Sequence, residues 1–233
     1  MKKIGILIFV AALVIGLVVS NMFSFGRTSG KLFNFSMNFG GVHGSGNVIT
    51  EKREVSGFKG VNVGGVYQVE IVAQKEFRVE IEGDDNLLPL ITTEVEGGIL
   101  KIEAAHKISP KSRILIRISA PDIDNLEVSG AANVVLNNIK NSALNIGSSG
   151  ASKVSVAGET VKLTIDVSGA TKIDAEDLKA QNASVDASGA SSVSVDVADR
   201  LDIDASGASR ISYAGTPTSV QKKISGASSV SPR

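Results

Sequence analysis

Cysteine and tryptophan are absent from this chain of 233 residues, and aromatic residues make up only 4% of it. Without cysteine, the protein can form neither a disulfide nor a thiolate metal site. The 24 basic residues balance the 24 acidic ones, so there is no net positive charge to attract nucleic acid. Beyond Phe77 the only aromatic residue is Tyr213, which leaves no aromatic platform for stacking a sugar.

The N-terminus holds the only long apolar run. Lys2 and Lys3 precede an uncharged stretch at residues 4–19, whose length lies between those of a signal-peptide core and a spanning helix. Extended to residue 25, the stretch is long enough to span a membrane. We therefore expect an apolar helix at residues 1–25, either a signal peptide or a membrane anchor. The rest of the chain would then be exported to the periplasm or cell surface, and residues 4–25, if retained, would tether it to the cytoplasmic membrane.

Residues 26–48 are rich in glycine and predict a flexible stalk. Within them, FNFSMNF at residues 33–39 alternates apolar and polar side chains. This period of two indicates a short strand or a strip that lies on the membrane surface.

The tripeptide Ser-Gly-Ala recurs six times, at intervals of 20, 19, 20, 18 and 19 residues. A catalytic motif is needed once, whereas recurrence at a fixed period is typical of a repeat architecture. The copies begin at Ser129, Ser149, Ser168, Ser188, Ser206 and Ser225.

Apolar residues flank each copy at alternate positions, which predicts two strands per repeat. Stacking the repeats as coils places like residues over one another in one interior. We therefore predict an all-β fold, a right-handed parallel β-helix (solenoid) of roughly 19-residue coils. Three positions before the serines stand Leu126, Ile146, Ile165, Val185 and Ile203, and five positions after them stand Val134, Val154, Ile173, Val193, Ile211 and Val230.

Ser-Gly-Ala itself is predicted to be the corner of each coil. The glycine permits a positive φ, the alanine is small enough to point into the bend, and the serine can hydrogen-bond the turn. Ile139, Leu178 and Ala198 indicate a short third face.

Residues 49–233 are expected to form one solenoid domain, with irregular coils at 49–120 and regular repeats at 121–233. The irregular part should form the first coils and cap the stack. One helical turn is expected in residues 84–90, before Pro89. The expected strands of the irregular part span residues 65–72, 77–83, 91–97, 99–104 and 113–119.

Several longer stretches now point to a family. They are GSGNVITEKREVSGFKGVNVGG (residues 44–65), VEIEGDDNLLPLITTEVEGGILKI (79–102), APDIDNLEVSGAANV (120–134) and the Ser-Gly-Ala array. Together they resemble the putative auto-transporter adhesin head (GIN) domain family of exported bacterial proteins. The resemblance implies a right-handed parallel β-helix outside the cytoplasm, and it carries over no catalytic or cofactor residue.

The position two before each serine forms an acidic column. In a stack its carboxylates would lie about 5 Å apart, so they would repel one another or share a cation such as Ca²⁺. Simple alternation predicts a solvated face instead, and we expect no metal site. The column reads Glu127, Gly147, Asp166, Asp186, Asp204 and Lys223.

A carbohydrate-binding or polysaccharide-degrading β-helix is the alternative function. A hydrolase would need two carboxylates in one cleft, and the available pairs are Asp166 with Asp174 and Asp196 with Asp202. His43 and His106, the only imidazole bases, both fall in loop-like sequence. We therefore expect no catalytic and no cofactor-binding residue. The predicted function is a non-enzymatic structural or adhesion module of the cell envelope, whose partner is an envelope component or an extracellular ligand.

The last repeat carries features that protect a sheet edge. Lys222 takes a position that is apolar in earlier copies, and Lys223 replaces the acid beside it. Pro232 removes a backbone donor. These features predict a monomer.

Overall fold

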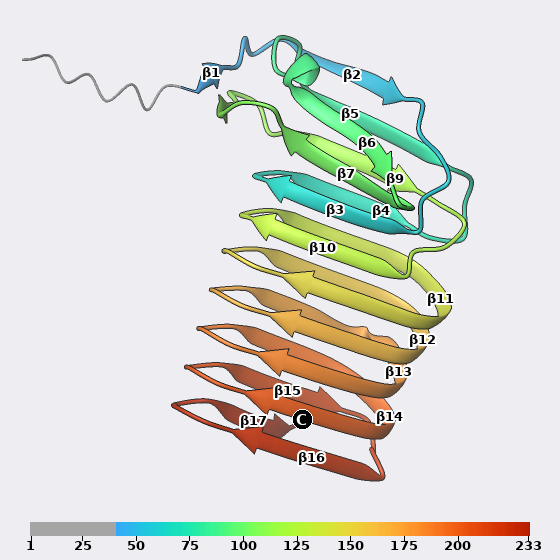
Figure 1. The fold of residues 1–233 in the computed structure, drawn as a ribbon, viewed down its shortest axis with the longest axis vertical. Coiled ribbons are helices and arrows are strands. Elements are labelled where there is room, and N and C mark those ends of the chain that lie inside the picture. Colours follow the sequence, from blue (N-terminus) through green and yellow to red (C-terminus); the bar gives the residue numbers. More distant parts are fainter. Residues whose placement is uncertain (1–40) are drawn as a thin grey trace, which may run out of the picture. The chain divides into compact units, whose positions relative to one another are not determined.

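The computed structural model describes residues 41–233, and nearly all the regular structure within them is β-strand (Figure 1). The expected apolar helix and the alternating segment at residues 33–39 lie outside the described residues. Within residues 41–233, no helix is long and apolar enough to cross a membrane. The elements are β1 (Val42–His43), β2 (Val48–Arg53), β3 (Gly60–Gly65), β4 (Gln68–Val72), β5 (Arg78–Asp84), the 3-10 turn η1 (Leu88–Leu90), β6 (Ile91–Glu96), β7 (Ile99–Ala104), β8 (Ile108–Ser109), β9 (Leu115–Ser119), β10 (Asn125–Gly130), β11 (Asn133–Ser148), β12 (Lys153–Val167), β13 (Lys172–Ala187), β14 (Ser192–Ala205), β15 (Arg210–Ala214), β16 (Ser219–Ile224) and β17 (Ser229–Pro232).

The strands wind as a β-solenoid whose coils lie one above the next (Figure 1). Each of β11 to β14 runs along one face after a Ser-Gly-Ala corner, bends, and returns along the other face to the next corner. We call the segments after a corner the back face and the segments before one the front face. Both faces pair in parallel, with Val134 beside Val154 on the back and Ile146 beside Ile165 on the front. The parallel all-β solenoid is therefore confirmed, while its right-handed winding stays a prediction.

The predicted apolar columns point into the interior. From Leu126 to Ile203 on the front face, and from Val134 to Ile211 on the back, every member is at most 4% exposed. These columns form one continuous core along the stack. Burial of this uniform aliphatic surface is the main force that holds coil on coil.

The short third face exists, but one predicted member was wrong. Ile139 and Leu178 are buried, whereas Ala198 is exposed and Val197 takes the inward position. The coil between Ser188 and Ser206 is the shortest, at 18 residues. The pairing of β13 with β14 therefore shifts register twice before it resumes, and these shifts bring Val197 beside Ala180.

The corner requires glycine for two reasons. At Gly169 the φ angle is +83°, in the left-handed region that side chains disfavour. A Cβ there would also lie 2.5 Å from the carbonyl oxygen of Gly150 in the preceding coil. That carbonyl accepts a 2.8 Å hydrogen bond from the amide of Ala170, and the same bond recurs at successive corners. The corners therefore stack backbone on backbone.

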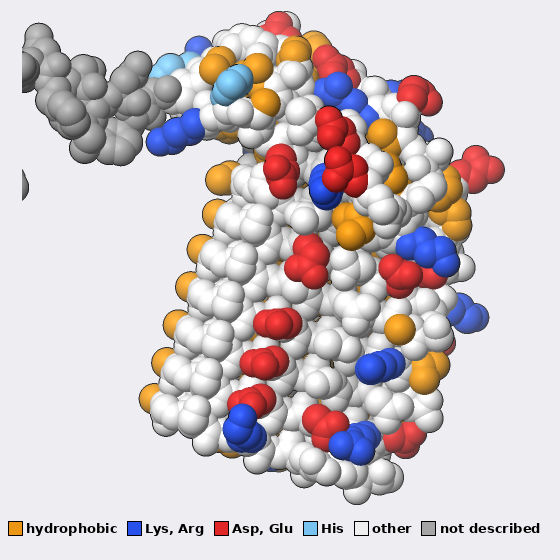
Figure 2. All heavy atoms as spheres, in the orientation of Figure 1, with side chains coloured by type: hydrophobic (Ala, Val, Ile, Leu, Met, Phe, Trp, Pro, Cys, Tyr) orange, Lys and Arg blue, Asp and Glu red, His pale blue; other side chains and the backbone are white. Residues whose placement is uncertain are grey.

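The corner alanine does not point into the bend as predicted. Every alanine of the six copies is exposed, and apolar side chains follow the corners as a column at the left edge of Figure 2. The positive φ of the glycine reverses the alternation, so that the next side chain projects outward. The residue after the alanine turns inward instead, and this position is small and at most 4% exposed at Ala132, Ser152, Thr171, Ser191 and Ser209.

One of the expected first coils lacks the tripeptide, and its corner was not predicted from the sequence. Residues 65–72, expected to be one strand, contain a corner between β3 and β4. Gly64 lies beside Ser129 and Gly65 beside Gly130, so Gly-Gly-Val replaces Ser-Gly-Ala here. The amide of Ala131 donates to the carbonyl of Gly65 at 3.0 Å, which continues the corner column.

The coils are not stacked in chain order. β7 pairs with β3 and β9 with β4, so residues 99–119 form a coil above residues 60–72. The chain then passes to the other side of β3, where β10 pairs with it. Antiparallel pairing of β6 with β7, of β5 with β9 and of β2 with β5 covers this end of the stack. The expected helical turn is the short η1, which contains Pro89 rather than ending before it.

Asp84 anchors the loops at this end. Its side chain is fully buried and accepts hydrogen bonds from the amides of Gly46, Lys111 and Ser112 at 3.0, 2.8 and 3.2 Å. Burial acts to raise the pKa of Asp84, but the donors outweigh it and the net pKa lies below its ordinary value. The carboxylate therefore ties residues 44–46 to the loop between β8 and β9.

Replacing Gly169 by alanine should lower the free energy of unfolding by about 3 kcal/mol, because strain at positive φ adds to a backbone clash. Gly226→Ala, in the last described coil, should cost less, because that coil can shift away from its single neighbour. Gly97→Ala is the matched control: its φ is +58° but nothing lies within 4 Å of a new Cβ, so about 1 kcal/mol is expected. Chemical denaturation measures all three. Equal losses at Gly169 and Gly226 would contradict the stacked-corner account.

Candidate functional site

The acidic column is assembled on the front face, where Figure 2 shows it as a line of acidic side chains ending at a basic one. Asp166, Asp186 and Asp204 are direct neighbours in register on consecutive strands. Paired strands lie about 4.8 Å apart, so the three carboxylates repel one another at close range.

A lysine of the chain itself neutralises the lower end of the column. Lys223 is the register neighbour of Asp204, and its Nζ lies 2.5 Å from an oxygen of that carboxylate. The hydrogen bond to Asp204, with a smaller contribution from Asp186, raises the pKa of Lys223. This column therefore already binds one primary ammonium group.

The column has a gap at Gly147, and the side chain of Glu127 lies across it. A Cβ on Gly147 would stand 2.0 Å from Oε2 of Glu127. Burial, and secondly the charge of Asp166, raises the pKa of Glu127. No ion pair joins Glu127 or Asp166 to another residue within the part of the chain that the structure describes.

The carboxylate pairs considered for hydrolysis are not brought together. Asp166 lies on the front face, whereas Asp174 lies on the back face beside Ser155 and Ser194. Asp196 and Asp202 also lie in different parts of the coil, and Asp202 is paired with Arg200 at 2.7 Å. His43 lies in β1 and His106 lies in the loop after β7. Among residues 41–233, no three acidic or histidine side chains are grouped so that they could hold a metal.

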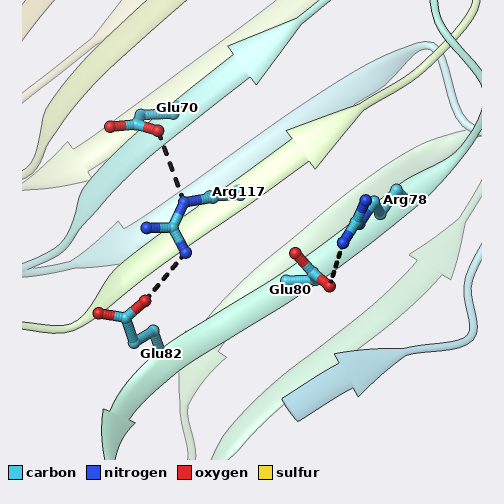
Figure 3. A network of polar contacts seen from close by, with 5 residues as sticks. All are labelled: Glu70, Arg78, Glu80, Glu82 and Arg117. Atoms are coloured by element: carbon cyan, nitrogen blue, oxygen red, sulfur yellow. Dashed lines mark hydrogen bonds and ion pairs between the residues drawn. The ribbon is translucent and has the colours of Figure 1, made fainter. Parts of the chain in front are cut away.

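The back face near the capped end carries a second cluster of charges (Figure 3). Arg117 on β9 contacts Glu82 at 2.9 Å and Glu70 at 3.8 Å, and Arg78 contacts Glu80 at 2.7 Å. The charges compensate one another across three neighbouring strands. We therefore regard this cluster as a structural feature of the sheet surface.

A cavity of about 620 Å³ opens at the corner of the coil formed by β3 and β4. Its lining includes Gly64, Gly65, Tyr67, Glu103 and His106. No sequence pattern predicted this cavity. Two signals point to it in retrospect: the doubled glycine that replaces Ser-Gly, and the long connection between β7 and β9.

The described residues form a β-solenoid with outward-facing columns of side chains and a corner cavity. The sequence profile described as "Putative auto-transporter adhesin, head GIN domain" matches residues 57–217. The chain belongs to this family, which confirms the resemblance noted from the sequence. No curated protein matches the chain.

The fold is shared with a solved structure. A putative adhesin from Bacteroides fragilis NCTC 9343 superimposes with a TM-score of 0.69 at 21% identity, covering 83% of this chain and 100% of that one. A putative lipid binding protein from Parabacteroides distasonis ATCC 8503 gives a TM-score of 0.49 at 21% identity, covering 82% and 99%. A putative adhesin from Parabacteroides merdae ATCC 43184 gives 0.49 at 18%, covering 82% and 98%.

Replacing Asp186 by asparagine should leave the melting temperature unchanged or raise it slightly, because the middle charge of the column is removed. The rise should be larger at low salt, and added Ca²⁺ should not shift the melting temperature of either form. Asp174→Asn is the control, since Asp174 has serine neighbours in its ladder. A Ca²⁺-dependent rise that Asp186→Asn abolishes would instead establish a metal-binding column.

Proposed function

We propose that this protein is an exported, non-enzymatic binding module of the cell envelope, of the adhesin-head type. The observation that carries the proposal is the match of residues 57–217 to the adhesin head family. The similar structure from Bacteroides fragilis NCTC 9343 is also named a putative adhesin. The partner would be an envelope component or an extracellular ligand.

The architecture supports a role in presenting side chains to a partner. Each coil repeats the same inward aliphatic residues, while the outward positions vary between serine, lysine and carboxylates. A solenoid of this kind offers an extended surface whose side chains are held in fixed register. The carboxylates that a hydrolase would need are dispersed over both faces in the described residues, which favours binding over catalysis.

Export is the part of this proposal that can be tested first. A reporter that works only outside the cytoplasm should be active when it is fused at residue 30 or at the C-terminus. A reporter that works only in the cytoplasm should be inactive at both positions. Activity of a cytoplasm-dependent reporter at the C-terminus would contradict the proposal. Fractionation of the same cells separates a cleaved chain from one tethered through residues 4–25.

The binding role is tested on the exported protein with a glycan array and a reducing-sugar assay in parallel. We expect no release of reducing ends from any polysaccharide, and adhesion of whole cells that falls when the gene is deleted. Release of reducing sugar would instead support the polysaccharide-degrading alternative.

We also propose that the module is a monomer whose lower edge is protected. Lys222 occupies the inward column below Ile203, and its Nζ lies 5.0 Å from the ring centroid of Tyr213. This cation–π contact places a charged group against the core of the last described coil. Pro232, which pairs with Tyr213 in β17, offers no backbone N–H to a further strand.

Changing Lys222 to isoleucine together with Pro232 to valine should therefore promote dimers or fibres, whereas the unchanged protein should sediment as a monomer. Lys172→Ile, in the middle of the stack, controls for the added apolar surface and should remain monomeric. Assembly of the unchanged protein through this end would show that the edge is an interface.

A further inference from the structure

The corner cavity exists because one position in the column of corner serines has no side chain. In register, Gly64 lies between Glu103 of the coil above and Ser129 of the coil below. A Cβ on Gly64 would lie 3.3 Å from Oγ of Ser129 and 3.8 Å from Oε1 of Glu103. The carboxylate and the hydroxyl therefore face the space that a serine would otherwise fill.

The surrounding loops turn this gap into a cavity with an apolar wall. Between β7 and β9 the chain makes a long excursion, and Ile108 and Pro110 of this excursion line the cavity together with Val66. Val66, at the position of the corner alanines, is 69% exposed. The volume of about 620 Å³ lies within the range of small-ligand sites.

Tyr67 supplies a polar group that has no partner. The side chain lines the cavity and is only 3% exposed, and its hydroxyl makes no hydrogen bond among the described residues. The hydroxyl oxygen lies 3.2 Å from the position of a Cβ on Gly65, directly under the glycine corner. Burial, and secondly the charge of Glu103, raises the pKa of Tyr67 to about 12, so the phenol stays protonated at neutral pH. A buried hydroxyl without a partner is costly, and a ligand atom could relieve that cost.

Glu103 places one carboxylate in the lining of the cavity, which also includes His106 and Lys107. Below the cavity lies a second hollow of about 390 Å³, which shares Glu103 and Ser129 with it and adds Glu127 and Asp166. Within residues 41–233, the carboxylates of Glu103, Glu127 and Asp166 form no ion pair. Glu127 and Asp166 belong to the acidic column, whose other end binds the ammonium of Lys223, whereas Glu103 lies in the column of corner serines.

We propose that the Gly64–Gly65 corner is a binding site for a lysine side chain of a partner protein, with Glu103 as its counter-ion. This inference deepens the proposed binding role and rests on it. The three N–H groups of the ammonium would find acceptors in the Glu103 carboxylate and in the hydroxyl oxygens of Ser129 and Tyr67. The aliphatic stem would pack against the apolar wall.

Lysine fits this site better than a sugar does. The ring of Tyr67 is buried and offers no face for stacking, whereas an alkyl chain can pack against the apolar wall formed by Val66, Ile108 and Pro110. Lys107 also lines the cavity, and its positive charge would limit the affinity of a single lysine. We therefore expect a dissociation constant in the millimolar range for an isolated lysine. A multivalent partner would bind more tightly.

Saturation-transfer NMR on the full-length protein tests the assignment with Nα-acetyl-lysine amide as the probe. We expect saturable transfer to the side-chain methylene protons, and weaker binding as salt is raised. The Nα,Nε-diacetyl compound, which has the same stem but no charge, should bind at least tenfold more weakly.

Three variants complete the test. Glu103→Gln removes the counter-ion at constant shape, and Gly64→Ser restores the usual corner residue and fills the gap. Both should abolish the transfer. Gly64 does not have a positive φ, so the serine is compatible with its backbone, and an unchanged melting temperature would show that the variant is folded. Glu94→Gln, on β6 at the same end of the stack, should bind like the unchanged protein.

Equal binding of the charged and diacetylated probes, or undiminished binding by Glu103→Gln, would overturn the lysine site. Absence of binding in the unchanged protein would overturn it as well. Cell adhesion that persists in Glu103→Gln while lysine binding fails would overturn the assignment of the bound lysine to an adhesion partner and leave the proposed binding role intact. Loss of adhesion on gene deletion is the separate test of that role.

Discussion

The structure depends on the contact between stacked glycine corners. At each corner the glycine carbonyl of one coil accepts a hydrogen bond from the alanine amide of the next, at 2.7–2.8 Å from Ala151 to Ala227. A Cβ on the next glycine would overlap that carbonyl. Only glycine permits this approach, so a glycine recurs at each corner from Gly65 to Gly226, and the spacing of nearly 19 residues follows from the length of chain needed to return to it.

Once the corners are in register, the rest of the coil is determined by alternation. The inward positions are buried and carry aliphatic residues, whereas the outward positions face solvent and carry polar ones. The same register that builds the core also places like charges over one another, as in the acidic column at Asp166, Asp186 and Asp204. Surface chemistry in this fold therefore comes as columns, and a break in a column, such as Gly64 or Gly147, leaves a local hollow.

Most of the regular stack could be predicted from the sequence, because the pairing of each coil with the next follows from local periodicity. Three features could not. The coil at residues 60–72 lies between two coils that come later in the chain, and no local pattern encodes that order. The corner alanine points outward because a positive φ interrupts the alternation. The cavity depends on the excursion between β7 and β9, whose path is set by the buried anchor Asp84.

The most direct test of the stacked-corner account is native-state hydrogen exchange of the corner amides. The account predicts slow exchange at Ala151, Ala170 and Ala190, each of which donates to the glycine carbonyl of the preceding coil. Protection should fall toward Ala227 in the last described coil, where fraying is easiest. Corner amides that exchange as fast as those of the exposed Ser56 and Gly57, between β2 and β3, would contradict it.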